Sequence, residues 1–304
     1  MAFTAKDVKE LREKTGCGMM DCKKALESSD GDMAKAVDFL REKGLAAATK
    51  KSSRIAAEGL AVAYTNEENT LGAAIEVNSE TDFVAKNSDF QEFVKLCGKT
   101  VIEKNPETVE ELLKIAVDGG KTIENILQEK ILTIGENLKI RRFKRFEGVV
   151  SAYIHAAGKI GVLVNFEVAD LDVSKSDEFK LFAKDIAMQI AAANPLYLVP
   201  EEVPAEVLDH ERKILKEQII NDGKPENIAE KIVEGRIGKY YKEICLLNQP
   251  FVKDSKLSVS DYTKETAKKL STEIKIKAFV RFEKGEGIEK KEDNFAEEVA
   301  GMIK

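Results

Sequence analysis

The chain has 304 residues, of which 43% are hydrophobic and 34% are charged, and its formal net charge is −6. This composition is typical of a folded globular protein of about two domains, and it argues against a largely disordered chain. The acidic balance also disfavours a general nucleic-acid-binding protein, because such proteins reach phosphates through clustered Lys and Arg.

Few residues in the sequence suggest reactive or metal-binding chemistry. The two histidines are His155 and His210, and the four cysteines form no CxxC pair. We therefore expect reduced thiols, no metal site and no cofactor. No charged-then-apolar leader opens the sequence, and no apolar run approaches the roughly 18 residues that span a bilayer. The expectation is a cytoplasmic protein without membrane contact.

Three short helical patterns occupy the first 54 residues. Helices are predicted over 4–14, 19–28 and 32–43, with the last one ending at Gly44. Together they predict a compact three-helix domain over 1–54, which includes a basic linker at its end.

The corner at Gly18-Met19-Met20 has two interpretations. Methionines at a helix start are either ordinary core residues or part of an adaptable binding surface. A helix-turn-helix that binds nucleic acid is a further possibility for this domain.

A duplicated segment dominates the middle of the chain. Residues 59–77 match residues 148–166, with Gly59 and Tyr64 corresponding to Gly148 and Tyr153. Each copy is predicted to form a two-stranded hairpin, followed by a helix and, further on, a closing strand. The repeat predicts an α+β fold of two antiparallel sheets covered by helices, with one core subdomain over 55–147 and a related one over 148–284.

The second copy is longer because residues 201–247 are inserted before its last helix and strand. Two amphipathic helices joined at 221–225 predict an antiparallel coiled-coil hairpin within this insert. Its apolar seam either closes on itself or meets a second copy of the chain in a homodimer. Residues 285–304 are predicted to form a short C-terminal helical module that docks on the chain's own core or on a partner.

A bulky aromatic residue, Phe83, lies in a polar turn of the first copy. Ile75 and Val77 alternate with smaller or polar residues as in a half-buried strand, which is predicted to end at Ser79. Asn87 is placed to begin the next helix. Phe83 is therefore either a plug for a small satellite core or a side chain presented to a partner.

Familiar catalytic motifs are absent from the sequence. There is no GxxxxGK[ST] phosphate loop, no HExxH and no GxSxG. Three functional classes remain: a binding or exchange factor, a nucleic-acid-binding module that uses the N-terminal helices, and an enzyme with an unrecognised site.

Several longer motifs point to the first of these classes. They are Leu11-Arg-Glu-Lys-Thr-Gly-Cys-Gly-Met-Met-Asp-Cys-Lys-Lys-Ala-Leu26, Thr81-Asp-Phe-Val-Ala-Lys-Asn87, Ile160-Gly-Val-Leu-Val164, Gly223-Lys-Pro225 with Glu234-Gly-Arg236, and Gln249-Pro-Phe-Val252 with Glu286-Gly-Ile-Glu-Lys290. With these motifs the chain resembles, essentially from end to end, the elongation factor Ts family, the guanine-nucleotide exchange factors of elongation factor Tu.

The resemblance implies both an architecture and an activity. The architecture is a UBA-like (ubiquitin-associated-like) three-helix domain, two related core subdomains, a coiled-coil dimerisation hairpin and a C-terminal module. The activity is binding to elongation factor Tu–GDP and promotion of GDP and Mg release, without covalent chemistry and without direct contact to nucleic acid.

The resemblance also assigns roles to particular residues. In the family, the TDFV turn intrudes beside the magnesium and phosphate region of the GTPase, which gives this role to Thr81, Asp82, Phe83 and Val84. The three-helix domain contacts the nucleotide domain of the GTPase, which points to Leu11, Met19 and Met20. A histidine of the second hairpin, His155, contacts a neighbouring domain of the GTPase; the alternative is a partly buried turn histidine.

Overall fold

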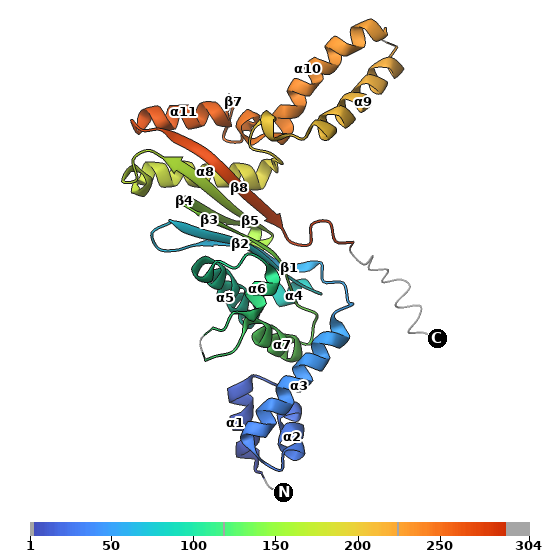
Figure 1. Cartoon of the computed structure of the whole chain (residues 1–304), viewed down its shortest axis with the longest axis vertical. Coiled ribbons are helices and arrows are strands. Elements are labelled where there is room, and N and C mark those ends of the chain that lie inside the picture. The colour runs from blue at the N-terminus through green and yellow to red at the C-terminus, as the bar shows by residue number, and fades with distance from the viewer. Residues whose placement is uncertain (1–2, 118, 224, 290–304) are drawn as a thin grey trace. The chain divides into compact units, whose positions relative to one another are not determined.

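The computed structural model describes residues 3–117, 119–223 and 225–289, with the side chains of 226–229 excepted. The C-terminal helix predicted for the 285–304 module therefore lies outside the described residues. Figure 1 shows the chain with its helices and strands labelled. The chain divides into two compact units. Unit 1 holds the described residues up to Ala61, Ile75–Phe143, and those from Phe282 on, and unit 2 holds Val62–Ala74 and Lys144–Arg281.

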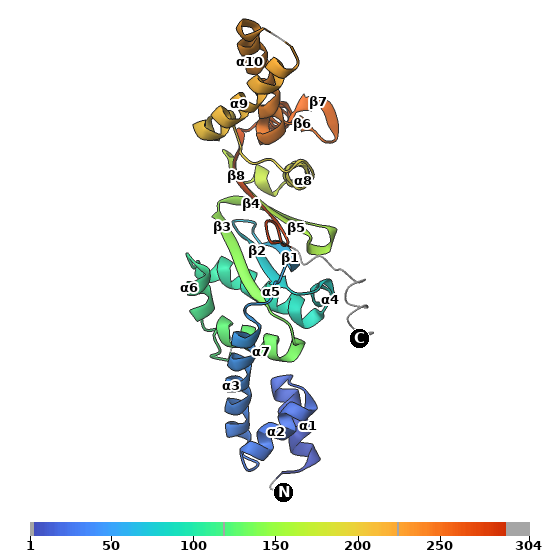
Figure 2. The ribbon, with the colours of Figure 1, turned by 90° about the vertical axis from the view of Figure 1, so that its right-hand side faces the viewer.

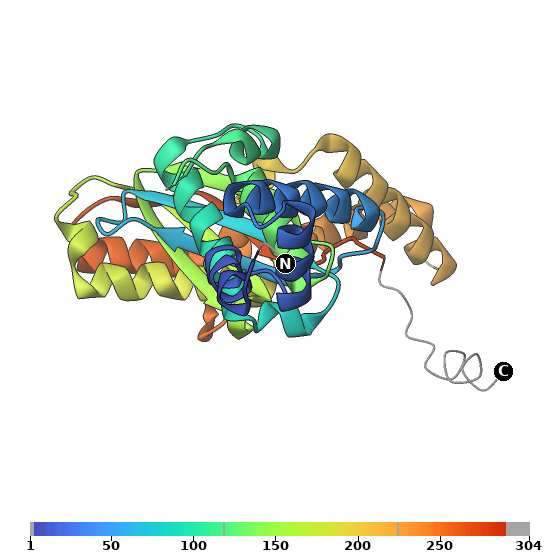
Figure 3. The ribbon, with the colours of Figure 1, turned by 90° about the horizontal axis from the view of Figure 1, so that it is seen from below.

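Unit 1 begins with three packed helices, α1 (Ala5–Thr15), α2 (Met19–Ser28) and α3 (Met33–Lys51). They face the viewer in Figure 3. The Thr4 side chain caps α1 in a reciprocal capping box with Asp7, and Asp32 caps α3. Their shared core is built from Val8, Leu11, Cys17, Cys22, Ala25, Leu26, Ala36 and Leu40.

The predicted end of the third helix at Gly44 is wrong, because α3 continues to Lys51. A side chain at Gly44 would place its Cβ 3.3 Å from the carbonyl oxygen of Gln128. Glycine here allows the close approach of α3 to the helix that carries Gln128, and this packing outweighs the weak helix propensity of glycine.

The first sheet has the strand order β1–β2–β3, formed by β1 (Glu58–Thr65), β2 (Leu71–Ser79) and β3 (Lys139–Glu147). Between β2 and β3 the chain forms four helices: α4 (Asp82–Ala85), α5 (Ser88–Lys104), α6 (Val109–Lys114) and α7 (Ile123–Ile134). The buried side chains of this part of unit 1 include Ile75, Val77, Phe90, Phe93, Val101, Leu112 and Ile123.

The second sheet has the order β4–β5–β8, formed by β4 (Val149–His155), β5 (Ile160–Val168) and β8 (Ile274–Glu283). β4 and β5 are antiparallel, with Val149 opposite Phe166 and His155 opposite Ile160. The 3-10 turn η1 (Ala156–Gly158) joins them, and η2 (Val173–Lys175) leads into α8 (Asp177–Ala193). α8 packs on β4 and β5 through a core that includes Val162, Val164, Phe166, Phe179, Phe182, Ile186 and Ile190.

After η3 (Pro200–Glu202), the predicted insert forms a hairpin of α9 (Ala205–Asn221) and α10 (Glu226–Ile244), which lie against one another in Figure 2. Its seam closes on itself through Leu215, Ile219, Val233 and Ile237. The chain then forms η4 (Leu246–Asn248), a small sheet of β6 (Pro250–Phe251) and β7 (Asp254–Ser258), and α11 (Val259–Lys269).

The sequence repeat corresponds to the same element order in both copies, a hairpin followed by a 17-residue helix and later a third strand. Gly59 and Gly148 share an unusual backbone, with φ of +115° and +114°. The helices α5 and α8 both end at a left-handed asparagine, Asn105 or Asn194. These special residues recur because each copy needs the same backbone geometry.

The α+β prediction is confirmed: helices combine with small antiparallel sheets. One detail is wrong, because β2 is buried on both faces rather than half-buried. Ala74 is small enough for a buried position, and the buried Glu76 is paired with two arginines described below. Within the described residues, every helix is too short or too polar to cross a membrane.

Candidate partner-binding site

The Phe83 side chain stands on a single helical turn that connects β2 to α5. It is 76% exposed, whereas the repeated pair Phe90 and Phe93 is buried in the core. The interpretation of Phe83 as a core plug is therefore wrong. Asn87 accepts hydrogen bonds from the N–H groups of Asp89 and Phe90, which starts α5 where the sequence predicts.

Val84 differs from its neighbours in the turn. Its side chain is only 6% exposed and points into unit 1, so Val84 supports the turn from beneath and does not present its side chain at the surface. Because Val84 is buried while Phe83 is exposed, the turn has one residue that anchors it and one that projects.

Asp82 and Lys86 form an ion pair beside the Phe83 ring. Lys86 Nζ lies 3.0 Å from Asp82 Oδ2 and 5.5 Å from the centre of the Phe83 ring. The hydrogen bond from Lys86 holds the pKa of the Asp82 carboxyl below its ordinary value, so this exposed carboxylate is charged at neutral pH. The turn thus presents an aromatic ring beside an opposed pair of charges.

A carboxylate from a distant segment, Glu136, holds the start of the turn. Its Oε2 accepts hydrogen bonds from the N–H groups of Glu80 and Thr81, both at 3.0 Å. Its Oε1 accepts a third from the Thr81 hydroxyl at 2.6 Å. Glu136 follows α7, and local sequence pattern gives no signal for this contact because the partners are 55 residues apart or more.

The reverse contact is made by the carboxylate of Glu80. Its Oε1 accepts a hydrogen bond from the Asn137 N–H at 2.6 Å and lies 3.4 Å from Arg54 Nη1. The Asn137 amide donates to the Arg54 carbonyl at 2.8 Å. The carboxylates of Glu80 and Glu136 therefore connect residues 80–81 to residues 136–137 in both directions. Arg54, shortly before β1, contacts both segments.

The methionine corner of the three-helix domain is also exposed. Met19 is 53% and Met20 is 73% exposed, so the interpretation as ordinary core is wrong for both. Leu11, in contrast, has no exposed surface and lies in the core of the domain. The expectation that Leu11 contacts a partner is corrected: it supports the surface from beneath.

The comparisons with known proteins agree on one family. The model of the family "Elongation factor TS" matches residues 80–286, a range that begins at the turn. The chain is 52% identical over 303 residues to elongation factor Ts of Clostridium perfringens, covering 99% of each chain. It is 54% identical over 301 residues to that of Clostridium acetobutylicum, covering 98% of this chain and 97% of the relative. The same protein of Trichlorobacter lovleyi is 50% identical over 305 residues, with 99% and 98% covered.

The chain belongs to the elongation factor Ts family.

Membership of the elongation factor Ts family makes the chain a translation elongation factor. The residues expected to bind a partner are distributed over both units. The turn and the methionine corner lie in unit 1, on α4 and α2, and His155 lies in unit 2 at the end of β4.

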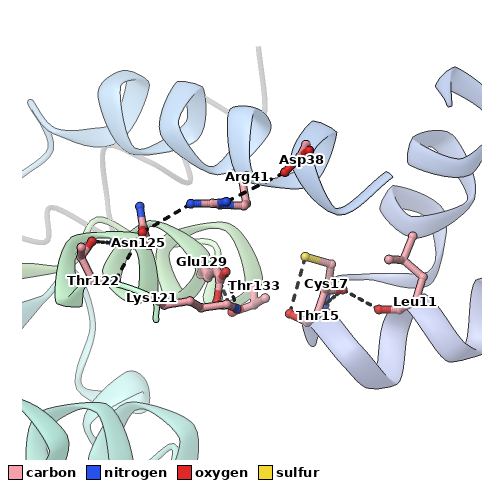
Figure 4. A network of polar contacts seen from close by, with 10 residues as sticks. All are labelled: Leu11, Thr15, Cys17, Asp38, Arg41, Lys121, Thr122, Asn125, Glu129 and Thr133. Carbon is pink, nitrogen blue, oxygen red and sulfur yellow. Dashed lines mark hydrogen bonds and ion pairs between the residues drawn. The ribbon is translucent and has the colours of Figure 1, made fainter. Parts of the chain in front are cut away.

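The three-helix domain of this elongation factor Ts family member is attached to α7 through α3 (Figure 4). Arg41 on α3 donates a hydrogen bond to Asn125 Oδ1 at 3.4 Å. Lys121 and Glu129, 2.7 Å apart, brace α7 beside it. Leu132 of α7 packs against the core of the three-helix domain. The methionine corner is thus carried on three helices that have defined contacts to α7 within unit 1.

His155 is exposed, so the alternative of a partly buried turn histidine is wrong. Its Nδ1 lies 3.1 Å from the Tyr153 hydroxyl, two residues earlier on the same face of β4. The chain then turns through Ala156 and Ala157, whose φ values of 47° and 53° are in the left-handed region that disfavours alanine. This strained turn displays the histidine at the tip of the hairpin.

Proposed function

We propose that this elongation factor Ts family member binds elongation factor Tu carrying GDP and promotes release of GDP and Mg, so that GTP can bind. The turn Thr81–Val84 enters the GTPase near its metal and phosphate site. The observation that carries this proposal is the combination of a 76% exposed phenylalanine with a backbone held on both sides, by Val84 below and by Glu136 at its start.

The exchange needs no covalent step by this chain. Tighter binding to the nucleotide-free GTPase than to the loaded form weakens nucleotide binding by the same factor, because coupling between two ligands is reciprocal. Burying the Phe83 ring in a groove of the partner contributes roughly 2 kcal/mol to this difference, a value typical of an interface anchor.

Asp82 contributes its charge to the same event. In the free protein it is paired with Lys86, and both side chains are largely exposed. At the phosphate and metal site of the GTPase, the Asp82 carboxylate repels phosphate oxygens and attracts the cation, while Lys86 is free to approach the anionic groups. The opposed pair therefore disturbs both charges that hold the nucleotide.

Further contacts with the GTPase come from Met19 and Met20 on the three-helix domain and from His155 on the second hairpin. Met side chains adapt their shape, which suits the first pair to a protein surface. The proposal includes the domain division 1–54, 55–147, 148–284 with the 201–247 coiled-coil hairpin, and 285–304. It also places the activity in the cytoplasm, with a homodimer through the hairpin as a separate proposal.

The experiment is a measurement of GDP release from elongation factor Tu with catalytic amounts of this protein. Phe83→Ala is expected to slow stimulated release about tenfold or more, because an anchor residue is lost. The matched control is Leu171→Ala, which removes a 64% exposed apolar side chain from the segment that replaces the turn in the second repeat. Stimulated release that is equally fast for Phe83→Ala and Leu171→Ala would refute the role of the turn.

The alternative of a nucleic-acid-binding module finds little support around α2. The surface hollow of about 360 Å³ beside Met20 is lined by both charge signs, through Asp21, Lys23, Lys24, Glu27 and Lys43. Lys43 pairs with Asp21 and Lys23 with Glu27, whereas a phosphate-binding surface carries clustered Lys and Arg that are not neutralised by neighbouring carboxylates. A gel-shift titration with DNA and RNA at two salt concentrations separates the two functions.

A further inference from the structure

The Glu136 side chain binds Glu80 and Thr81, where the chain leaves β2 and the turn begins, by three hydrogen bonds at once. One carboxylate oxygen accepts both backbone N–H groups, of Glu80 and Thr81, and the other accepts the Thr81 hydroxyl. Hydrogen bonds to a carboxylate are stronger than those between neutral groups. The direction in which the backbone leaves β2 is therefore fixed by Glu136.

The Thr81 hydroxyl is used in an unusual way. Thr81 occupies the N-cap position of α4, where a threonine oxygen ordinarily accepts a hydrogen bond from the first helical turn. No such side-chain cap is present at Thr81, whose hydroxyl donates to Glu136 instead. The contact with Glu136 takes the place of the local cap, so α4 depends on a residue 55 positions away.

Phe83 has few contacts of its own that set its orientation. Its ring is mostly exposed, and its neighbour Lys86 is itself an exposed, flexible side chain. The ring is consequently held in place by the backbone below it, through buried Val84 and through the start of the turn at Thr81. A side chain presented in one orientation loses less entropy on binding than a mobile one.

We propose that Glu136 is a positioning residue for nucleotide exchange, which holds the Thr81–Val84 turn in the conformation that inserts Phe83 into the partner. Asn137, beside it, completes the same connection by donating its N–H to Glu80. The inference rests on the proposed function of the turn, and it adds a residue whose role lies entirely within this chain.

The first test measures the turn without any partner. Amide hydrogen exchange is followed in the free protein with Glu136→Ala, Glu136→Gln and the wild type. Glu136→Ala is expected to accelerate exchange at residues 80–86 about tenfold, as expected for loss of two to three hydrogen bonds, with α5 unchanged. Glu136→Gln retains an acceptor oxygen and a similar shape, so it is expected to restore most of the protection. Unchanged exchange at 80–86 in Glu136→Ala would overturn the proposal.

The matched control is Glu111→Ala. The Glu111 carboxylate also accepts a backbone N–H, that of Glu107, at 2.8 Å, but it lies on α6 and does not contact the turn. This variant is expected to leave the exchange of residues 80–86 and the stimulated GDP release at their wild-type values. It controls for the general loss of a carboxylate that binds backbone.

The second test asks whether Glu136 acts through Phe83. Stimulated GDP release is measured for Glu136→Ala, Phe83→Ala and the double variant. Glu136→Ala alone is expected to slow release about fivefold to tenfold, and to add less than about twofold when Phe83 is already absent. An equal slowing in both backgrounds would mean a general structural role and would contradict the proposal. If Phe83→Ala stimulates GDP release from the GTPase as well as the wild type does, the proposed function of the turn fails. The hydrogen-exchange result still decides whether Glu136 holds the turn in its conformation.

Discussion

Replacing Glu76 with alanine should loosen the connection between the parts of β2 and β3 that belong to unit 1 and residues 282–288. Glu76 is fully buried on β2. Its Oε1 accepts hydrogen bonds from Arg141 Nη1 at 3.0 Å and from the Gly285 N–H at 2.8 Å, and its Oε2 accepts from Arg142 Nε at 2.6 Å. A single carboxylate thus joins β2, β3 and the segment that follows β8.

The loss of stability in Glu76→Ala follows from the donors that lose their acceptor. Without Glu76, two arginine charges, the Gly285 N–H and the buried Asn78 amide, which donates to Glu76 Oε1 at 3.1 Å, lose their shared acceptor. Breaking a buried ion pair typically costs 3–5 kcal/mol. The side chains of Arg141 and Arg142 are 26% and 32% exposed, so water partly replaces the carboxylate. Both also contact Glu286, through its carbonyl and its carboxylate. We therefore expect the lower end of the range, about 3 kcal/mol.

The assay is native-state hydrogen exchange at the amides of β2, β3 and 283–286. A loss of about 3 kcal/mol corresponds to roughly a hundredfold faster exchange. The control is Glu13→Ala, which removes an exposed ion pair with Lys9 in the same unit and should cost under about 0.5 kcal/mol. If Glu76→Ala changes the protection of these amides no more than Glu13→Ala does, the argument from burial is refuted.

Two other predictions concern the same segment and the hairpin. Gly285→Ala should release residues 283–287 to proteolysis, because its φ is +69° and an added Cβ would lie 2.0 Å from the Ala57 carbonyl oxygen; Gly287→Ala, with φ +71° and open space around it, should cost only about 1 kcal/mol, and equal effects would contradict the clash. Because the seam of the α9–α10 hairpin is closed, a homodimer through it has to use its exposed side chains, so Ile214→Lys with Ile220→Lys should convert any dimer to a monomer in sedimentation, with helicity retained in circular dichroism. An unchanged sedimentation coefficient of a dimer would exclude this face.

The features that the sequence predicts well are those fixed by short-range chemistry. Asn87 begins α5, and the repeated glycines Gly59 and Gly148 mark equivalent backbone positions. The sequence draws attention to Met19, Met20 and Phe83 but does not predict that their side chains are exposed. For an isolated apolar residue, hydrophobic periodicity does not distinguish a core position from a surface position.

The features that the sequence does not reveal depend on distant segments. Glu76 looks like the solvent-facing residue of a half-buried strand until Arg141 and Arg142 are brought to it. Gly44 looks like a helix end until α7 packs against it. Glu136 has no distinguishing neighbour in sequence, and its importance lies in contacts with Glu80 and Thr81. In each case a long-range contact overrides a local preference.

The bond between Glu76 and Gly285 also has a consequence for synthesis of the protein. Unit 1 takes residues from both ends of the described chain. The Glu76 carboxylate and the Gly285 N–H therefore meet only after all of unit 2 has been translated. At 5–20 residues per second, the interval between Arg142 and Gly285 is on the order of ten seconds. During that time Glu76 has its arginines but not its backbone partner. Unit 1, although it begins first in the chain, can therefore complete its hydrogen bonds only after unit 2 has been synthesised.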